Sequence, residues 1–198
     1  MKRRAAMDGD GNSEDGMTSY VKLFDAATMM AGVREIARKI AEHFAGSEKE
    51  FALVGIHQLG VPLAKMLCDE LAAHGWHPDF GMLDITMYRD DIGTRNLLPM
   101  IHETVIPFDV NGREIILVDD VLSTGRTIRA ALDALTDYGR PGLIRLAVLV
   151  DRGEPEFPIR ADFVGFHVSL PAERKVLVRF DDDGEPGAGI FDVNWHRQ

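Results

Sequence analysis

The sequence has little cysteine, no long apolar run and no excess of positive charge. Its 198 residues include one cysteine, Cys68, which excludes an internal disulfide. No uncharged apolar run approaches the ~18 residues that a membrane-spanning helix needs, and residues 1–17 lack the apolar stretch of a signal peptide. The formal net charge of -10 disfavours broad, non-specific attraction to nucleic acid. We therefore expect a soluble, cytoplasmic protein with no membrane partner.

The length suits one well-packed domain better than two domains with separate cores. Residues 1–18 are polar and rich in glycine, so we predict a disordered N-terminal tail. The remainder, residues 19–198, has the ordinary balance of a globular protein and is expected to form a single domain.

The spacing of apolar residues predicts alternating strands and helices. From Asp25 apolar residues recur at helical spacing, and Gly46 ends that run. Residues 88–112 are polar and irregular, and a connection of this length indicates a functional flap. The pattern of the whole is typical of an α/β fold, in which a central parallel sheet is flanked by helices. The expected strands cover 51–56, 80–87, 114–118, 144–150, 163–168 and 175–180, and the helices 25–44, 61–74 and 124–138.

An acidic pair follows the apolar run 115–118. Asp119 and Asp120 stand where such a strand would leave the sheet, and open α/β sheets bind ligands at the carboxyl ends of their strands. Two carboxylates there can accept hydrogen bonds from vicinal hydroxyl groups and lie close to a divalent cation.

A turn rich in hydroxyl groups comes next and opens a helix. Residues 123–127 read Ser-Thr-Gly-Arg-Thr and offer backbone N–H groups at the positive end of a helix dipole. Taken separately, the acidic pair fits a solvated strand end and the turn fits a helix cap. Together they indicate a sugar-phosphate site, with hydroxyls on the carboxylates and phosphate on the turn. The Walker lysine and the spaced glycines of dinucleotide sites are absent.

Segment 118–127 resembles the motif with which type I phosphoribosyltransferases bind 5-phosphoribosyl diphosphate (PRPP). Further segments are similar to the bifunctional pyrimidine-operon regulators that also act as uracil phosphoribosyltransferases. The likeness covers roughly residues 22–180. The segments that carry it are 84–91, 133–135, 138–141, 146–153 and 157–162.

The resemblance implies a type I phosphoribosyltransferase fold with a flexible flap and a small hood. It also implies transfer of a phosphoribosyl group from PRPP to uracil with Mg²⁺, giving UMP and diphosphate, in a homo-oligomer (dimer or tetramer). Asp119 and Asp120 would face the ribose hydroxyls and the metal, and with Arg89 form the catalytic set. The phosphate would lie on Ser123, Thr124, Gly125, Arg126 and Thr127, the flap would start at Tyr88, Arg89, Asp90 and Asp91, and the base would meet Val150, Asp151, Arg152 and Gly153.

The loop 57–60 matches the family's pyrophosphate loop but departs from it. His57, Gln58, Leu59 and Gly60 form the loop, and Leu59 stands where the family usually has an arginine. That change removes a cation that could hold pyrophosphate, a task left to backbone N–H groups and His57. A non-catalytic sensor of uridine nucleotides is therefore an alternative function.

Two further alternatives concern partners. Members of the family bind a hairpin in pyrimidine-operon leader RNA. Here Glu35 lies among the helix positions that would contact the RNA, and an acidic group there would repel a phosphate. The second alternative is a purine phosphoribosyltransferase, which would have an acid at the position of Ser123. The residues that the resemblance offers to RNA are Arg34, Arg38, Lys39, Arg140 and Arg160.

Overall fold

The computed structural model describes residues 17–47, 50–90, 101–181 and 186–195. It divides into two compact units. One comprises residues 27–169, and the other is formed by the two ends of the chain, up to residue 26 and from residue 170.

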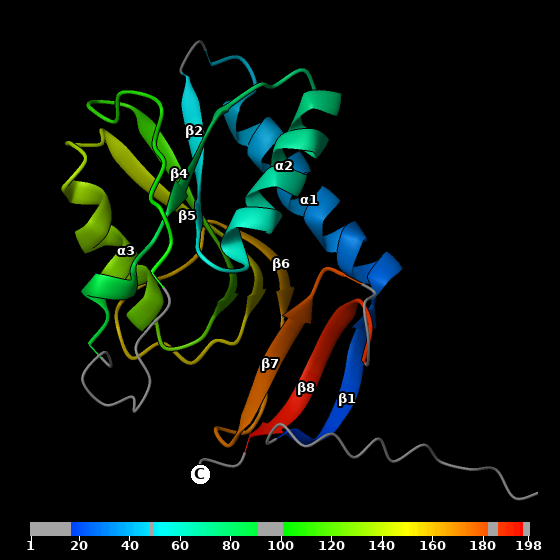
Figure 1. The fold of residues 1–198 in the computed structure, drawn as a ribbon. Coiled ribbons are helices and arrows are strands. Elements are labelled where there is room, and N and C mark those ends of the chain that lie inside the picture. Colours follow the sequence, from blue (N-terminus) through cyan, green and yellow to red (C-terminus); the bar gives the residue numbers. More distant parts are fainter. Residues whose placement is uncertain (1–16, 48–49, 91–100, 182–185, 196–198) are drawn as a thin grey trace, which may run out of the picture. The chain divides into compact units, whose positions relative to one another are not determined.

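The larger unit is built on a five-stranded parallel sheet with the strand order β3-β2-β4-β5-β6 (Figure 1). Every residue of β2 is buried, because parallel strands are covered on both faces. This sheet confirms the α/β fold predicted from the sequence. The strands are β2 (Phe51–Ile56), β3 (Asp79–Leu83), β4 (Glu114–Leu122), β5 (Leu143–Asp151) and β6 (Phe163–His167).

Helices cover both faces of this sheet. α1 (Ala26–Phe44) and α2 (Gly60–Ala73) lie on one face, and α3 (Arg126–Thr136) lies on the other (Figure 1). Alternate residues of β4 serve the two faces, and Ile115 and Leu117 join the apolar cluster that contains the buried alanines of α3. No helix in the part of the chain that the structure describes is long and apolar enough to cross a bilayer.

The smaller unit is a three-stranded antiparallel sheet with the order β1-β8-β7. Its strands are β1 (Met17–Asp25), β7 (Arg174–Arg179) and β8 (Gly189–Trp195). Ile190, Phe191 and Val193 of β8 are buried. Only β7 was predicted. Residues 1–16 of the predicted tail lie outside the described residues.

Three boundaries differ from the predictions near the carboxyl ends of the strands. β3 ends at Leu83, because the Asp84 carboxylate accepts the Thr86 N–H at 2.6 Å and the chain enters a short 3₁₀ helix, η1 (Thr86–Tyr88). β4 continues through Leu122, so the acidic pair lies within the strand. α3 begins at Arg126, two residues later than predicted.

Gly60 allows α2 to begin against the end of β4. A Cβ atom at this position would lie 2.2 Å from the Val118 carbonyl oxygen and 3.2 Å from the Asp119 Cα. Contacts this short do not occur with side chains present, so only glycine permits the approach. The backbone that precedes Asp119 is thereby held against the helix start.

We predict that Gly60→Ala lowers the free energy of unfolding by about 2–4 kcal/mol, because backbone must shift to admit the methyl group. Chemical denaturation measures the change. Gly75→Ala is the control, since Gly75 has φ 81° but open space around it. That control should cost only about 1 kcal/mol, the strain of an alanine in the left-handed region. Equal losses in the two variants would show that the predicted clash is relieved without cost.

Candidate functional site

The acidic pair lies inside the sheet, near the carboxyl end of β4. Val118 pairs with Gly55 of β2 and Ala147 of β5, and Asp119 pairs with Val148. The pair therefore follows the last residue of β4 that pairs with β2 and is itself paired with β5, at the edge of the sheet where α/β proteins bind ligands.

The two carboxylates carry an electrostatic cost. Asp119 is 6% exposed and Asp120 is half-buried, and the Asp120 N–H donates to Asp119 Oδ1 at 3.0 Å. Burial raises the pKa of Asp119 well above its ordinary value, and repulsion from Asp120 adds to the rise, whereas the charge of Arg89 opposes it. Burial also raises the pKa of Asp120. A bound cation would relieve this cost.

The donor set fits Mg²⁺ shared with a substrate. Within the described residues, no group of three or more His, Cys, Asp or Glu side chains could hold a metal ion by itself. Mg²⁺ is commonly held by one or two carboxylates, with substrate phosphates and water completing its octahedron. Asp119 and Asp120 can supply that share, and the bound ion would neutralise negative charge on a leaving diphosphate.

The turn between β4 and α3 has the form of an anion cradle. Gly125 is the N-cap of α3 with φ 87°, a left-handed conformation that favours glycine. The first N–H groups of a helix have no intrahelical acceptors and attract anions. Ser123, Thr124 and Thr127 are half-buried around this helix start. The structure thus brings the predicted phosphate turn directly after the acidic pair.

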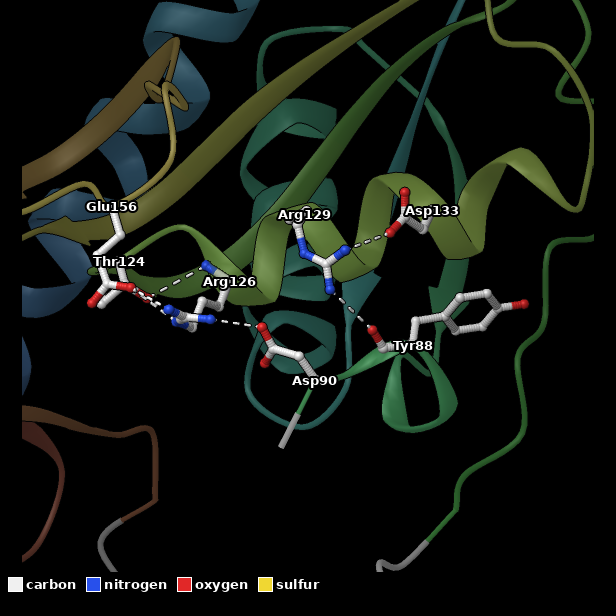
Figure 2. Close-up of polar contacts among 7 residues, drawn as sticks. All are labelled: Tyr88, Asp90, Thr124, Arg126, Arg129, Asp133 and Glu156. Carbon is white, nitrogen blue, oxygen red and sulfur yellow. Dashed lines mark hydrogen bonds and ion pairs between the residues drawn. The ribbon is translucent and has the colours of Figure 1, made fainter. Parts of the chain in front are cut away.

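The Arg126 side chain is held by two carboxylates. Its Nε and Nη2 donate to Glu156 Oε2 at 2.9 and 2.6 Å, and its Nη1 donates to Asp90 Oδ2 at 2.7 Å (Figure 2). The pKa of Arg126 is raised, first by the bonds to Glu156 and then by the bond to Asp90. Neither carboxylate was singled out as its partner by the sequence.

The stem of the flap, residues 88–90, contacts α3 at further points. The Tyr88 hydroxyl donates to the Asp137 carboxylate, which raises the pKa of Tyr88. Arg129 Nη2 donates to the Tyr88 carbonyl at 3.5 Å. Arg89 lies close enough to Asp119 to lower its pKa. The predicted flap residue Asp91 lies outside the described residues.

The loop between β2 and α2 contains a stacked pair of imidazoles. The rings of His57 and His102 lie 4.8 Å apart with an interplanar angle of 10°. His57 Nε2 is buried and makes no hydrogen bond to a described residue. His102 Nδ1 lies 3.8 Å from Asp84 Oδ2, and the peptide bond between His57 and Gln58 is cis. Leu59 precedes the first residue of α2 and provides no side-chain cap.

A cavity of about 510 Å³ lies on the base side of the phosphate turn. Ser123, Asp151 and Gly153 line it, together with Arg160. Val150 is buried in β5, and the Arg152 N–H donates to the Leu122 carbonyl at 2.9 Å. The predicted base-binding segment and the phosphate turn therefore border one cavity. Arg152 itself is 7% exposed, with Nη2 at 3.0 Å from Glu154 Oε2.

The candidate RNA-binding residues differ in their contacts. Arg38 is held by Glu35 and Glu42, through a bidentate pair at 2.8 Å with the former. Lys39 donates to the Val164 carbonyl at 2.9 Å and lines the base-side cavity together with Arg160. Arg34, on α1, and Arg140, in the turn between α3 and β5, are exposed; Arg140 is not among the residues that line the cavity.

Sequence reasoning missed several residues of this site. Glu156 and His102 contact predicted site residues, but each lies in an irregular segment with no motif spacing of its own. Phe157 begins the segment 157–162 that carries the family resemblance, but its contact with Arg126 was not predicted. The one available signal for Glu156 was its place within the connection that continues the predicted base-binding segment.

Comparison with known proteins agrees with this geometry. Residues 19–175 match the phosphoribosyl transferase domain family. A protein of Roseiflexus sp. named bifunctional protein PyrR is 49% identical over 87% of this chain and 94% of its own length. Another of that name from Thermus aquaticus is 51% identical over 89% and 98%.

A similarity among solved structures concerns the fold alone. The hypoxanthine phosphoribosyltransferase of Trypanosoma cruzi superposes with a TM-score of 0.66 at 18% identity, over 89% of this chain and 97% of that one. Together with the domain match and the two relatives, this shows that the chain belongs to the phosphoribosyltransferase family, within its PyrR group.

Proposed function

We propose that this protein transfers the phosphoribosyl group of PRPP to uracil, forming UMP and diphosphate, and that it also regulates pyrimidine genes by binding leader RNA. The observation that carries the enzymatic half is the continuity of the site. An acidic pair, a phosphate turn and a base-side cavity follow one another along β4 and β5. These three parts correspond to the ribose, the 5′-phosphate and the base of a nucleotide.

Each part would contribute to the transfer step. Breaking the anomeric C–O bond of PRPP builds positive charge on the ribose and negative charge on the departing diphosphate. The Asp119 and Asp120 carboxylates would hold the ribose hydroxyls and face the developing cation. The turn 123–127 would fix the 5′-phosphate, so that the base meets the anomeric carbon in a defined position.

A pyrimidine is favoured over a purine by the residue at the phosphate turn. Ser123 borders the base-side cavity and cannot serve as the acid or base that a purine ring nitrogen would need. The Leu122 carbonyl is occupied by the Arg152 N–H, and the Asp151 carboxylate accepts the Gly153 N–H at 2.8 Å. These hydrogen bonds fix the backbone at the end of β5. A fixed backbone is what recognition of a small base by backbone groups requires.

Uracil, PRPP and Mg²⁺ should give UMP, and hypoxanthine, guanine and orotate should not compete. Chromatographic detection of nucleotides measures the products. Turnover of a purine alone would replace this proposal with the purine alternative. Binding of UMP without any turnover would support the sensor, with Leu59 as its structural cause.

Asp119→Asn should separate function from stability. The raised pKa means that the folded chain keeps a proton that the unfolded chain releases, so stability falls as pH rises above the ordinary value of 3.8 toward the raised one. At pH 7.5 the neutral amide should raise the melting temperature by about 2–4 °C while UMP formation falls about 100-fold or more.

Thermal unfolding and the UMP assay, run on the same samples, check both halves. Asp69→Asn, which removes an exposed carboxylate of α2, is the control and should change neither quantity. A less stable Asp119→Asn protein would mean that contacts not evident from its burial stabilise the ionised carboxylate.

The regulatory half depends on cations of α1. Hydrogen bonds from Arg38 lower the pKa of Glu35 to about 2, so Glu35 is ionised at every physiological pH. The positive charge of Arg38 is thus engaged by carboxylates of its own helix. Arg34 and Arg160 remain exposed without an ion pair to any residue in the described ranges.

Glu35→Gln should free Arg38 from one of its two carboxylate partners, with Glu42 remaining, and so strengthen binding of the pyrimidine-operon leader RNA. We expect a gain of about two- to fivefold at low salt, and a log–log salt slope steeper by about one. Filter binding with and without UMP measures both, and Glu70→Gln on α2 serves as a control for the loss of one negative charge. Affinity that is unchanged both in Glu35→Gln and in Glu35→Gln combined with Glu42→Gln would remove Arg38 from the RNA-binding surface.

A further inference from the structure

Arg126 belongs to the predicted phosphate-binding set, yet its side chain is engaged elsewhere. Each of its three guanidinium nitrogens donates to a carboxylate, two of them to Glu156 and one to Asp90 (Figure 2). The guanidinium carbon also lies 5.6 Å from the centroid of the Phe157 ring. The group is about half exposed, so these contacts do not follow from burial.

The two carboxylates come from opposite sides of the site. Asp90 belongs to the flap stem, directly after η1 and Arg89. Glu156 belongs to the connection between β5 and β6, which also carries the base-side residues. Arg126 stands between them at the first position of α3.

The Glu156 side is fixed to the phosphate turn by the backbone. The N–H groups of Glu156 and Phe157 both donate to the Thr124 carbonyl, at 2.9 and 3.2 Å. A Cβ atom on Gly125 would lie 3.4 Å from Phe157 Cβ, so the segment lies directly against the turn. Glu156 is thus a fixed acceptor for Arg126.

We propose that Arg126 is a latch, a positioning residue that ties the flap stem to the phosphate turn through Asp90 and Glu156. The 5′-phosphate is then received by the N–H groups and hydroxyls of the turn, and Arg126 keeps the stem beside it. The inference rests on the proposed binding of PRPP and changes the role that the family resemblance gives to Arg126.

The charges make the latch distinguishable from a direct phosphate contact. Arg126 with its two carboxylates has a net charge of about -1, which repels a phosphate. If Arg126 bound phosphate directly, Asp90 and Glu156 would compete with the substrate, and neutralising either would tighten PRPP binding. If Arg126 is a latch, the same changes loosen the stem and weaken PRPP binding.

The first measurement is hydrogen exchange of residues 86–90 in the full-length protein without ligand. Arg126→Gln, Asp90→Asn and Glu156→Gln should each speed exchange there by about three- to tenfold. The control is Glu50→Gln, which breaks the 3.1 Å pair between Arg113 and Glu50 at the amino ends of β4 and β2 and should leave the stem unchanged. Exchange that is unaltered in all three variants would overturn the latch, whether or not the protein binds PRPP.

The second measurement is the dissociation constant of PRPP with Mg²⁺, by calorimetry without uracil. Each of the three changes should weaken binding by about three- to tenfold, and Arg126→Gln combined with Glu156→Gln should be no weaker than Arg126→Gln alone. The KM for uracil should stay constant. Tighter PRPP binding in Asp90→Asn or Glu156→Gln would overturn the proposal, because it would show competition for a phosphate-binding arginine. Absence of PRPP binding in the unaltered protein would refute the proposed function, and the exchange data would still decide the latch.

Discussion

Burial of the Asp119 carboxylate near the end of β4 is the constraint on which the rest of the site depends. An ionised carboxylate in such a place costs free energy unless a cation or hydrogen-bond donors compensate it. The Asp120 N–H supplies one donor at 3.0 Å, and the positive charge of Arg89 also lowers the pKa of Asp119. This compensation is only partial. A metal ion and ribose hydroxyls bound as proposed would complete it, so part of their binding free energy would come from relieving the electrostatic cost of the buried carboxylate.

Holding a destabilising group requires a rigid frame, and the parallel sheet provides it. β4 pairs with β5 along its length and with β2 up to Val118, and both of its faces are covered by helices. Gly60 lets α2 start against the Val118 carbonyl, so the backbone before the acidic pair cannot relax away. The turn 123–127 begins three residues after Asp120, which would fix the proposed ribose and phosphate subsites relative to each other.

The sequence predicted this frame because its signals are local. Apolar runs and helical spacing marked β2, β4, β5 and α1 to within a few residues, and the acidic pair and the turn 123–127 stood next to each other in the chain. β1 and β8 were missed although they have nine and seven residues. β1 begins within the polar stretch that was interpreted as a tail, and β8 follows an acidic, glycine-containing stretch, so both were assigned to irregular chain. The engagement of Arg126 was missed because Asp90 and Glu156 are 36 and 30 residues away from it, and no spacing rule relates such positions.

A motif does not show whether an individual cation is already engaged by partners that lie far away in the sequence. Arg126 and Arg38 are both residues that a family resemblance assigns to phosphate groups, and both are held by pairs of carboxylates. A guanidinium so engaged binds a new anion only if it leaves its partners, and each departure exposes a carboxylate that repels the incoming phosphate. His57 differs from both arginines, because its buried Nε2 has no hydrogen-bond partner in the described part of the chain, and it lies in the same loop as Leu59. Whether a side chain is already engaged by partners can be seen only in the folded chain. This engagement therefore distinguishes the groups that can bind substrate from those that hold the site together.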